Sequence, residues 1–378
     1  MISTLRIDHH APHKADLIRV LITALAPLSD QPDVRTWWLH RHWKLGPHLL
    51  VLVETVSDPL PDTVSLIERA AGAAVRACPS DNPVDPEQWI LTSVALGRAE
   101  LVEGPYGPVR PDNTISWVTD GALDTFIRDE AALEVKGRLT AAGLPVLADA
   151  SARGEDARTS ALIGMMTLAT AYPDGGMTRG YLAFLSHWKE FLHWLPAGAD
   201  IESSWAAAYD EQKDFLDALL RDVATPDDRP GAEAQQWRGW AQEAHDPARD
   251  LARRGLVLPY PHADRFDLAK GMGDDLGRRW GGDDDRSYSD FHVQFRKLDF
   301  TRLGDSDAFS AYRFTINCFF DLVTLMDVSP LERYALAYFL TRAVEDQTET
   351  TWSDIVARGV ARQALDPDAH PTLPWRGR

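Results

Sequence analysis

The stretch TWWLHRHWKLGPHLLVLVE, residues 36–54, places three tryptophans and three histidines directly before an unbroken apolar run. Residues 34–43 alternate in the manner of a β-strand, whereas every position from 49 to 53 is apolar. A strand without a polar face has to be covered on both sides, because either side would otherwise expose hydrophobic surface to water. The sequence therefore predicts a sheet in the first third of the chain, with at least one strand buried on both faces.

The rest of the chain changes from mixed strand and helix to mostly helix. Beyond residue 121 the apolar residues recur at helical spacing, and Pro- and Asp-rich breaks separate the periods. We predict an α+β fold in a single domain, residues 1–378, whose sheet-rich part (1–120) has a mainly helical part (121–378) packed on it. The other expected elements are strands at 5–8, 89–102 and 291–300, helices at 15–28, 63–76, 124–142, 158–171, 178–195, 201–223, 232–254, 310–327, 330–346 and 351–361, and a loop at 271–290.

Charge, cysteine content and the lengths of the apolar runs argue against a nucleic-acid-binding, secreted or membrane-spanning protein. The formal net charge of −18 over 378 residues argues against nucleic acid as a partner, because such binding needs a basic face. Cys78 and Cys318 are too few for a disulfide framework and fit a reducing compartment. Arg19 interrupts the apolar N-terminal stretch, so no signal peptide is expected, and no apolar run is long enough to cross a membrane. We expect a cytoplasmic protein, monomeric or weakly dimeric, without a membrane partner.

Most motifs that announce a cofactor are absent. The sequence contains no G-x-G-x-x-G or Walker loop, no H-E-x-x-H, no C-x-x-C and no G-x-S-x-G. Asp283, Asp284 and Asp285 can ligate a hard cation, although adjacent acids in a glycine-rich loop are usually solvated. The expectation is chemistry on ordinary side chains, with no cofactor and no metal.

The opening stretch resembles a motif of a known family. In the C-terminal elimination domain of lantibiotic dehydratases, also found as the thiopeptide-type bacteriocin biosynthesis domain, the motif reads roughly W-F-F-I-R-Y-W-D-P-G-P-H-L-R-L-R. Trp37 and Trp38 match its aromatic pair, Arg41 its arginine and Trp43 its later aromatic, and residues 46–49 match its G-P-H-L. Three further segments resemble the family in the expected order: VEGPYGPVRP (102–111), GYLAFLSHWKEFLHWL (180–195) and FTINCFFDLVTLMDVSPLERYALAYFL (314–340).

The departures from the family pattern are chemically informative. In the elimination enzymes, two arginines of the H-L-R-L-R strand hold a glutamylated Ser or Thr side chain, whereas this chain has Leu50 and Leu52. The turn arginine is replaced by Pro105, and residues 312–317 lack the closing histidine. Leucine cannot bind a carboxylate, so the glutamyl group would lose charge-assisted hydrogen bonds of about 1.5–3 kcal/mol each.

A scaffold kept without its elimination chemistry resembles the stand-alone pyridine synthases of thiopeptide biosynthesis. The resemblance implies a formal aza-[4+2] cycloaddition between two dehydroalanines of an azole-containing, leader-bearing peptide, with loss of water and of the leader peptide. Such a reaction depends mainly on holding two ends of a flexible peptide together, and orientation can contribute about 7–11 kcal/mol. The implied partner is therefore a modified precursor peptide.

Four residues are expected to be catalytic from the resemblance, because tautomerisation of an amide and loss of water need hydroxyl and imidazole groups. Tyr312 stands where the family carries its closing catalytic position, and His187 belongs to the family's Ser-His pair. Ser287 and Tyr288 follow the aspartate-rich loop. For each residue the alternative is structural: a core tyrosine with a bonded hydroxyl, a satisfied histidine, or loop residues that satisfy the backbone.

Six further residues are expected to contact the substrate. Arg41 can anchor peptide backbone or rest on tryptophan faces as a surface cation. Trp38 and Trp43 can stack on azoles, but neighbouring tryptophans on one strand alternate faces, so some of them must be core. The others are Trp188, which also belongs to an apolar helical stripe, and Ser289 and His292.

Two other functions stay open. One is a stand-alone glutamate-elimination partner of a split dehydratase, and the missing arginines argue against it. The other is a non-catalytic scaffold that binds a leader peptide and presents it to other enzymes.

Overall fold

The computed structural model describes residues 1–118, 129–154, 156–173, 175–196, 198–225, 231–257, 263–281, 286–298 and 307–365. The chain divides into two compact units. Unit 1 comprises Met1–Gly154, Asp267–Leu276 and Cys318–Asp327, and unit 2 comprises Glu155–Phe266, Gly277–Asn317 and Val328–Arg378. The strands lie in unit 1 and most of the helices in unit 2, so the α+β prediction is confirmed. That the two units form one domain stays a prediction.

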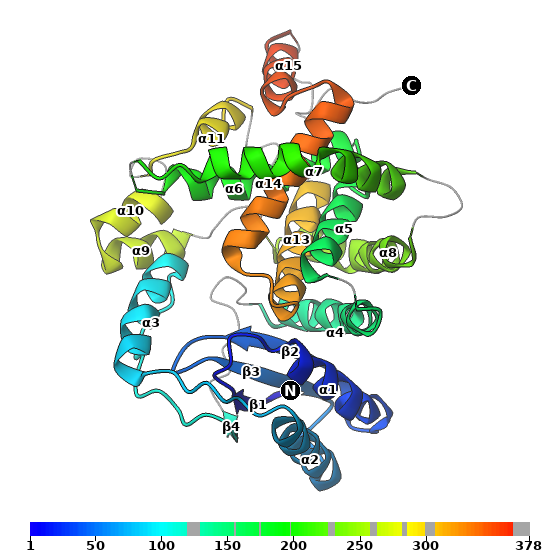
Figure 1. Ribbon diagram of the computed structural model, residues 1–378, viewed down its shortest axis with the longest axis vertical. Coiled ribbons are helices and arrows are strands. Elements are labelled where there is room, and N and C mark those ends of the chain that lie inside the picture. Colours follow the sequence, from blue (N-terminus) through cyan, green and yellow to red (C-terminus); the bar gives the residue numbers. More distant parts are fainter. Residues whose placement is uncertain are drawn as a thin grey trace. The chain divides into compact units, whose positions relative to one another are not determined.

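Unit 1 is built on an antiparallel sheet of order β2-β3-β1-β4 (Figure 1). All eight residues of β3 are buried, which confirms the prediction from its apolar run. The turn from β2 to β3 uses left-handed backbone at Leu45 and Gly46, with φ of 63° and 112°. The strands are β1 (Ile2–Asp8), β2 (Val34–His42), β3 (His48–Thr55) and β4 (Thr114–Val118).

Each face of the sheet has its own cover. On one face Trp38 packs with Leu50 and Leu52 beneath α4 (Glu130–Ala152), where Gly137 leaves room for the indole: a Cβ there would lie 2.8 Å from the ring. On the other face, Trp37 donates to Ser29 of η1 (Ala26–Asp30), and Trp117 donates to Glu68 of α2 (Pro61–Ala77). α1 (Ala15–Leu25) packs against α2. The strict alternation of β2 therefore divides its two tryptophans between two layers.

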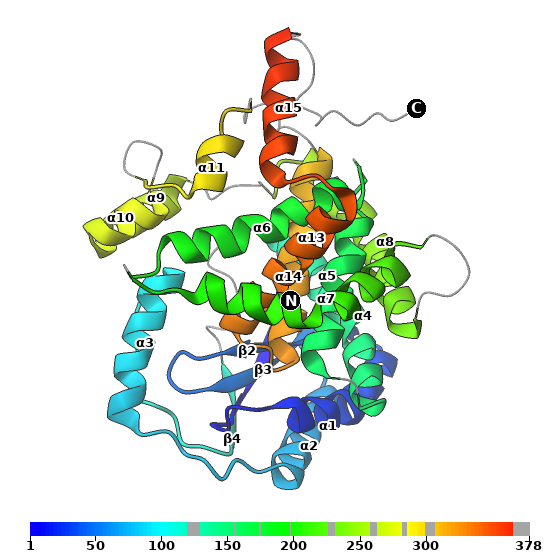
Figure 2. The same cartoon turned by 45° about the horizontal axis from the view of Figure 1, so that its top comes forward.

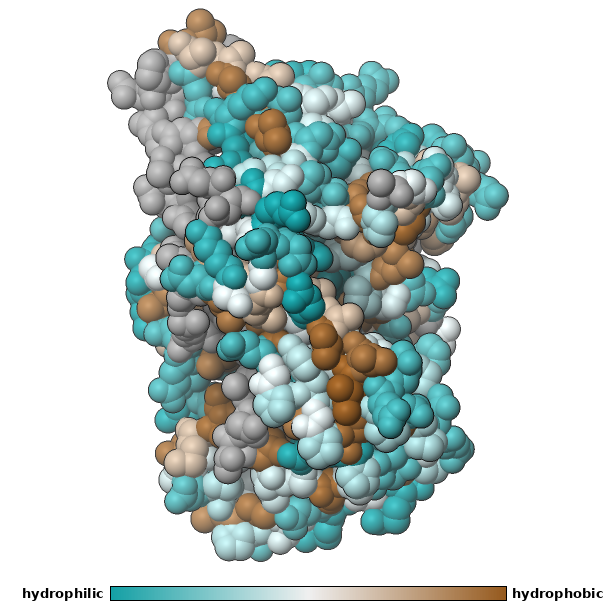
Figure 3. Space-filling model, turned by 90° about the vertical axis from the view of Figure 1, so that its left-hand side faces the viewer, coloured by the Kyte–Doolittle hydropathy of each residue, from teal (hydrophilic) through white to brown (hydrophobic). Residues whose placement is uncertain are grey.

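The strand predicted at 89–102 is wrong, because this segment is helix α3 (Pro86–Glu100). Asp85 caps the helix by accepting from the backbone N–H of Gln88, and Pro86 occupies its first turn. The apolar residues are spread around the helix, so no single stripe revealed the helical period; Leu91 and Val94 are 64% and 38% exposed. Figure 3 shows the side on which α3 lies, where hydrophobic patches interrupt a mostly hydrophilic surface.

Two further predictions of secondary structure, at 291–300 and at 271–290, are wrong because these segments contain short helices. The strand expected at 291–300 begins as helix α11 (Asp290–Phe295), capped by Ser289. The loop expected at 271–290 contains helix α10 (Asp274–Trp280), preceded by α9 (Ala263–Met272). In both places the polar residues that resemble turn signals serve as helix starts.

Unit 2 is a helical assembly (Figure 2). α14 packs on α5, α6 and α7, and α5 packs in turn on α6, α7 and α8. Ser329 and Glu332 form a capping box at the start of α14. The helices are α5 (Ala157–Thr170), α6 (Met177–His193), α7 (Ile201–Ala224), α8 (Ala232–Arg253), α13 (Asp307–Leu325, shared between the units), α14 (Pro330–Thr348) and α15 (Trp352–Leu365). Within the described part of the chain, no helix is both long and apolar enough to span a bilayer.

α5 and α6 approach backbone to backbone at Gly180. A Cβ on Gly180 would lie 2.2 Å from the main-chain oxygen of Ala169, and because this oxygen belongs to the backbone of α5, it can move aside only if the helix shifts with it. Gly239, in α8, faces open space instead.

We expect Gly180→Ala to lower the free energy of unfolding by about 3 kcal/mol or more, because the new methyl group overpacks a helix contact. The matched variant Gly239→Ala should leave stability unchanged or raise it by up to about 1 kcal/mol, since alanine favours helix. Urea unfolding followed by circular dichroism measures both. Equal effects of the two substitutions would contradict this account of the α5–α6 contact.

Candidate functional site

Polar side chains of α6 meet the segment 286–292 within unit 2. His292 lies between two hydroxyls: its Nε2 is 3.1 Å from Ser186 Oγ, and its Nδ1 is 2.7 Å from Ser289 Oγ. Two turns further along α6, His193 Nε2 is 2.9 Å from Ser287 Oγ. We call this group the α6 polar cluster. Its members are Ser186, Glu190, His193, Arg286, Ser287, Ser289 and His292.

Local structure explains how these groups are presented. Ser186, Glu190 and His193 are spaced i, i+4 and i+7, so they lie along one side of α6. The buried stripe of the same helix holds it in the core of unit 2. On the opposite segment, the Ser289 hydroxyl accepts from the backbone N–H of His292, at 3.4 Å, and caps α11. The helix cap therefore also orients the imidazole.

Glu190 supplies the negative charge of the cluster. Its Oε1 accepts from Arg286 Nη2 and from Trp194 Nε1, each at 3.0 Å. Its Oε2 lies 3.2 Å from His292 Nδ1. The side chains of Glu190 and His292 are only 17% and 19% exposed, so solvent screens this contact weakly.

Burial lowers the pKa of His292 to about 4. Glu190 opposes this shift, whereas Arg286, Arg313 and His193 add to it. The imidazole is therefore neutral near pH 7 and can accept a proton at one nitrogen while donating at the other.

Tyr288 lies beside the cluster, between two cations. The guanidinium carbons of Arg286 and Arg296 are 5.0 and 4.5 Å from the centre of its ring, within the range of a cation–π contact. The predicted catalytic role of Tyr288 stays a prediction.

Two more of the predicted residues, His187 and Trp188, also lie on α6. Trp188 is 3% exposed, and its indole donates to Thr341 Oγ1 at 3.0 Å. The Nε2 atom of His187 is buried, and burial together with Arg313 and Arg333 holds the pKa of this histidine well below its usual range. The hydrogen bond to His292 Nε2 is made by the neighbouring residue, Ser186.

Tyr312 is packed in the core of unit 2. Its hydroxyl donates to the main-chain oxygens of Gly180, at 3.0 Å, and Leu168, at 3.3 Å, and its ring centre lies 4.5 Å from that of Tyr172. Burial raises the pKa of the phenol well above its usual value. These contacts support the α5–α6 packing, and a catalytic role for Tyr312 stays a prediction.

Three predicted substrate contacts, Arg41, Trp38 and Trp43, lie in unit 1. Arg41 forms an ion pair with Asp327 and donates to the main-chain oxygens of Thr324 and Pro12. Asp327 in turn accepts from the backbone N–H groups of residues 14 and 15 at the start of α1. Arg41 thus joins the start of α1 to the end of α13.

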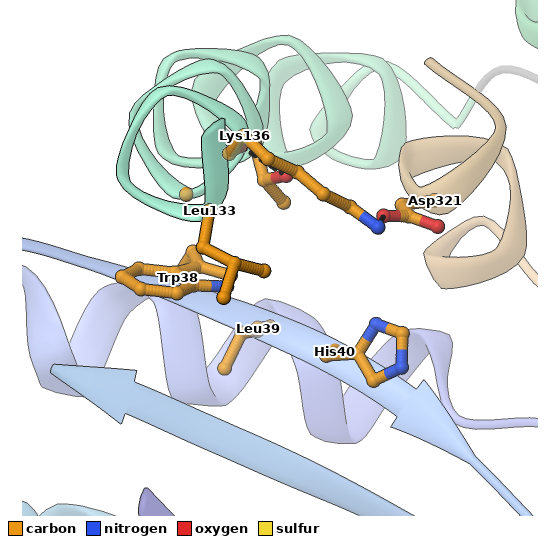
Figure 4. A pocket seen from close by; sticks show the side chains of 8 residues that line it. Trp38, Leu39, His40, Leu133, Lys136 and Asp321 are labelled. Atoms are coloured by element: carbon orange, nitrogen blue, oxygen red, sulfur yellow. Dashed lines mark hydrogen bonds and ion pairs between the residues drawn. The ribbon is translucent and has the colours of Figure 1, made fainter. Parts of the chain in front are cut away.

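Of the two tryptophans, Trp38 is buried and Trp43 is partly exposed. Trp38 is 6% exposed and forms part of a pocket of about 20 Å³, room for about one water molecule, below Leu133 and the Lys136–Asp321 ion pair (Figure 4). The Trp43 ring stacks on His42 with centres 5.1 Å apart, and its Nε1 donates to Glu100. Azole stacking by either tryptophan stays a prediction.

The leucines that replace the family's arginines are core residues of unit 1. Leu50 and Leu52 are 6% and 0% exposed and pack against Trp38. The neighbour of Leu50 across the sheet is Arg6, which forms an ion pair with Asp8 at 2.7 Å and donates to the main-chain oxygens of residues 44–46. Arg6, which lies opposite Leu50 in the sheet, is thus engaged within the protein.

The sequence interpretation missed Ser186, Glu190 and His193. Their i, i+4, i+7 spacing was visible on the predicted helix at 178–195, but nothing local indicated that residues about a hundred positions later would face them. Asp283, Asp284 and Asp285 lie outside the described residues. Within the described part of the chain, no group of three or more His, Cys, Asp or Glu side chains is arranged to hold a metal ion.

The low pKa of His292 predicts a pH-dependent contribution to stability. An unfolded imidazole takes up its proton near pH 6.5 and the folded one near pH 4, so between these values the unfolded state binds more protons and the free energy of unfolding falls as the pH falls. We expect the stability difference between wild type and His292→Gln to shrink when urea unfolding is repeated from pH 7 down to pH 4.5. A constant difference across this range would show that the pKa of His292 is the same in the folded and unfolded states.

Comparison with known proteins gives structural matches. No protein-family model and no curated protein matches the sequence. Among solved structures, the chain is similar to the pyridine synthase TbtD from thiomuracin biosynthesis, with a TM-score of 0.67 and 23% identity over 91% of this chain and 98% of that one. It is also similar to TsrL, with a TM-score of 0.62 and 14% identity over 94% and 97% of the two chains. The chain therefore has the fold of these two proteins over nearly their whole length.

Proposed function

We propose that this protein is a pyridine synthase of thiopeptide biosynthesis, which forms a central pyridine by a formal aza-[4+2] cycloaddition between two dehydroalanines of a modified precursor peptide. The observation that carries the proposal is the similarity of fold to TbtD across 98% of that enzyme. The ordered motif resemblance of the sequence supports it independently.

The reaction balances without an oxidant. One amide becomes its imidic acid, and two carbon–carbon bonds then close a six-membered ring that contains its nitrogen. The ring hydroxyl leaves as water and the leader leaves as a carboxamide, each with one proton from a ring carbon, which yields the aromatic pyridine. The protein has to hold the two alkenes in contact and move protons between oxygen, nitrogen and carbon.

The α6 polar cluster has the groups for those proton transfers. Neutral His292 can take a proton at one nitrogen, and hydroxyls stand at both of its nitrogens. Ser287 is exposed and bonded to His193, so a peptide can reach this pair from solvent. We assign Ser287 and His292 to proton transfer and Tyr288 to a surrounding contact with substrate, whereas Ser289, which is 2% exposed, orients His292.

The elimination alternative is disfavoured by packing. The positions that would bind the carboxylate of a glutamylated side chain are Leu50 and Leu52, which are buried against Trp38. Placing a cation there would bury an unpaired charge.

The test is incubation of the purified protein with a thiazole-rich precursor that contains two dehydroalanines, followed by mass spectrometry. We expect free leader carboxamide and a macrocycle lighter than the precursor by water and the leader. Persistently intact precursor contradicts the proposal, and formation of dehydroalanine from a glutamylated peptide would instead support the elimination alternative.

The effect of single substitutions on kcat distinguishes a catalytic function from a scaffold that only binds the leader peptide. Ser287→Ala should lower kcat by about 10²-fold, within the range of general acid–base contributions. Ser203→Ala, an exposed serine on α7, is the matched control and should leave kcat unchanged. Tyr312→Phe tests the role expected from the resemblance: a loss of stability of about 1 kcal/mol with unchanged kcat would assign this tyrosine to the core.

A further inference from the structure

Arg313 is a partly buried cation on α13, directly after Tyr312. In the part of the chain that the structure describes, no hydrogen bond and no ion pair engages its guanidinium. Arg286, by contrast, pairs with Glu190 at 3.0 Å. A partly desolvated charge without a partner destabilises the folded chain, so a cation kept in this state is typical of a site that receives an anion.

Arg313 lies beside the α6 polar cluster. The Tyr312 hydroxyl donates to the Gly180 carbonyl on α6, and His187 follows two turns further along the same side of that helix. Burial and then Arg313 lower the pKa of His187, and Arg313 also adds to the burial that lowers the pKa of His292. Charges are largely screened beyond about 10 Å, so the guanidinium lies near both imidazoles.

The proposed reaction creates negative charge on a substrate oxygen. Removal of the proton from an amide N–H leaves an imidate, in which most of the negative charge lies on oxygen. A base of the α6 polar cluster takes this proton, and return of the proton to the oxygen gives the imidic acid and restores the base. A guanidinium beside the base can donate hydrogen bonds to the oxygen while its charge develops.

We propose that Arg313 is a further catalytic residue, whose guanidinium binds the oxygen of the tautomerising amide and stabilises its imidate form. This inference rests on the proposed function. The amide is neutral when it binds, so the charge of Arg313 is neutralised only while the proton is away from the substrate. A carboxylate of the protein in the same place would neutralise the guanidinium permanently and weaken the effect.

The stability of Arg313→Met tests whether the cation is unpaired. Methionine keeps an unbranched apolar stem and removes the charge. We expect the urea midpoint of this variant to equal or exceed that of the wild type, because no partner loses a bond. A lower midpoint would show that the guanidinium is bonded within the folded protein, and it would overturn the inference.

Kinetics separate stabilisation of an imidate from binding of an anion that the substrate already carries. Arg313→Met should lower kcat by about 10²–10³-fold, the usual cost of losing an oxyanion donor, with KM changed by no more than about twofold. Arg313→Lys keeps the charge without the planar fork and should recover part of the lost activity. Arg254→Gln is the matched control, because this exposed arginine of α8 pairs with Asp250, and it should leave kcat unchanged. A raised KM with unchanged kcat would overturn the inference.

Titration with acetate tests the anion site without turnover. Acetate has the planar geometry of an imidate, with oxygen in place of the N–H group. In ¹⁵N NMR spectra of the histidine-labelled, full-length protein at constant ionic strength, we expect acetate to shift the signals of His187 and His292 saturably in the wild type and in Arg254→Gln, but not in Arg313→Met. Absence of a saturable shift in the wild type, or the same shift in Arg313→Met, would overturn the inference. A wild type that responds to acetate but shows no turnover would contradict the proposed function and leave the anion site at Arg313 in place.

Discussion

The contact between α5 and α6 at Gly180 is the constraint on which the candidate site depends. α6 carries a buried stripe on one side and the polar residues Ser186 and Glu190 on another, so the orientation of the helix decides what those polar groups can meet. Because Gly180 has no side chain, the two backbones approach until only hydrogen would fit, and the Tyr312 hydroxyl bonds to the Gly180 carbonyl at the same place. This packing leaves little freedom for α6 to turn.

The second element of the site is held by a cap rather than by packing. Ser289 begins α11 and at the same time contacts the imidazole of His292 three residues later. The short helix α11 therefore fixes the position of the His292 side chain. Arg286 completes the arrangement because it neutralises Glu190 and lies over Tyr288. Each charge in this part of the cluster is matched by another, so the cluster offers hydrogen bonds and a neutral base rather than a net charge.

In unit 1, β3 is a core strand. In the family pattern two arginines would project from β3, and here Leu50 and Leu52 project into the layer formed by Trp38 and α4. Exchanging cations for leucines removes the need to solvate or pair them, and the gain is apolar area buried between sheet and helix. Leucine side chains that are buried against Trp38 cannot bind a carboxylate, so this layer cannot be both closely packed and carboxylate-binding.

The opening stretch alone determined much of the fold. Its alternation from Val34 to His42 and the apolar run that follows require a strand pair covered on both faces, because the side-chain period of two leaves no other way to bury them. Helical periods likewise located α5 to α8 and α14. The strands predicted at the positions of α3 and α11 were wrong, because these helices are defined by the caps Asp85 and Ser289 rather than by an apolar stripe.

Only the tertiary structure decided what the polar residues do. Ser186 and His292 are separated by 106 positions, and no local period relates them. The sequence pointed to Ser287, Ser289 and His292, and the folded chain brings them to Ser186, Glu190 and His193. Local sequence determines which side of a helix a residue occupies, but its partner is decided by the packing of distant helices, which depends on contacts such as that of Gly180 with Ala169.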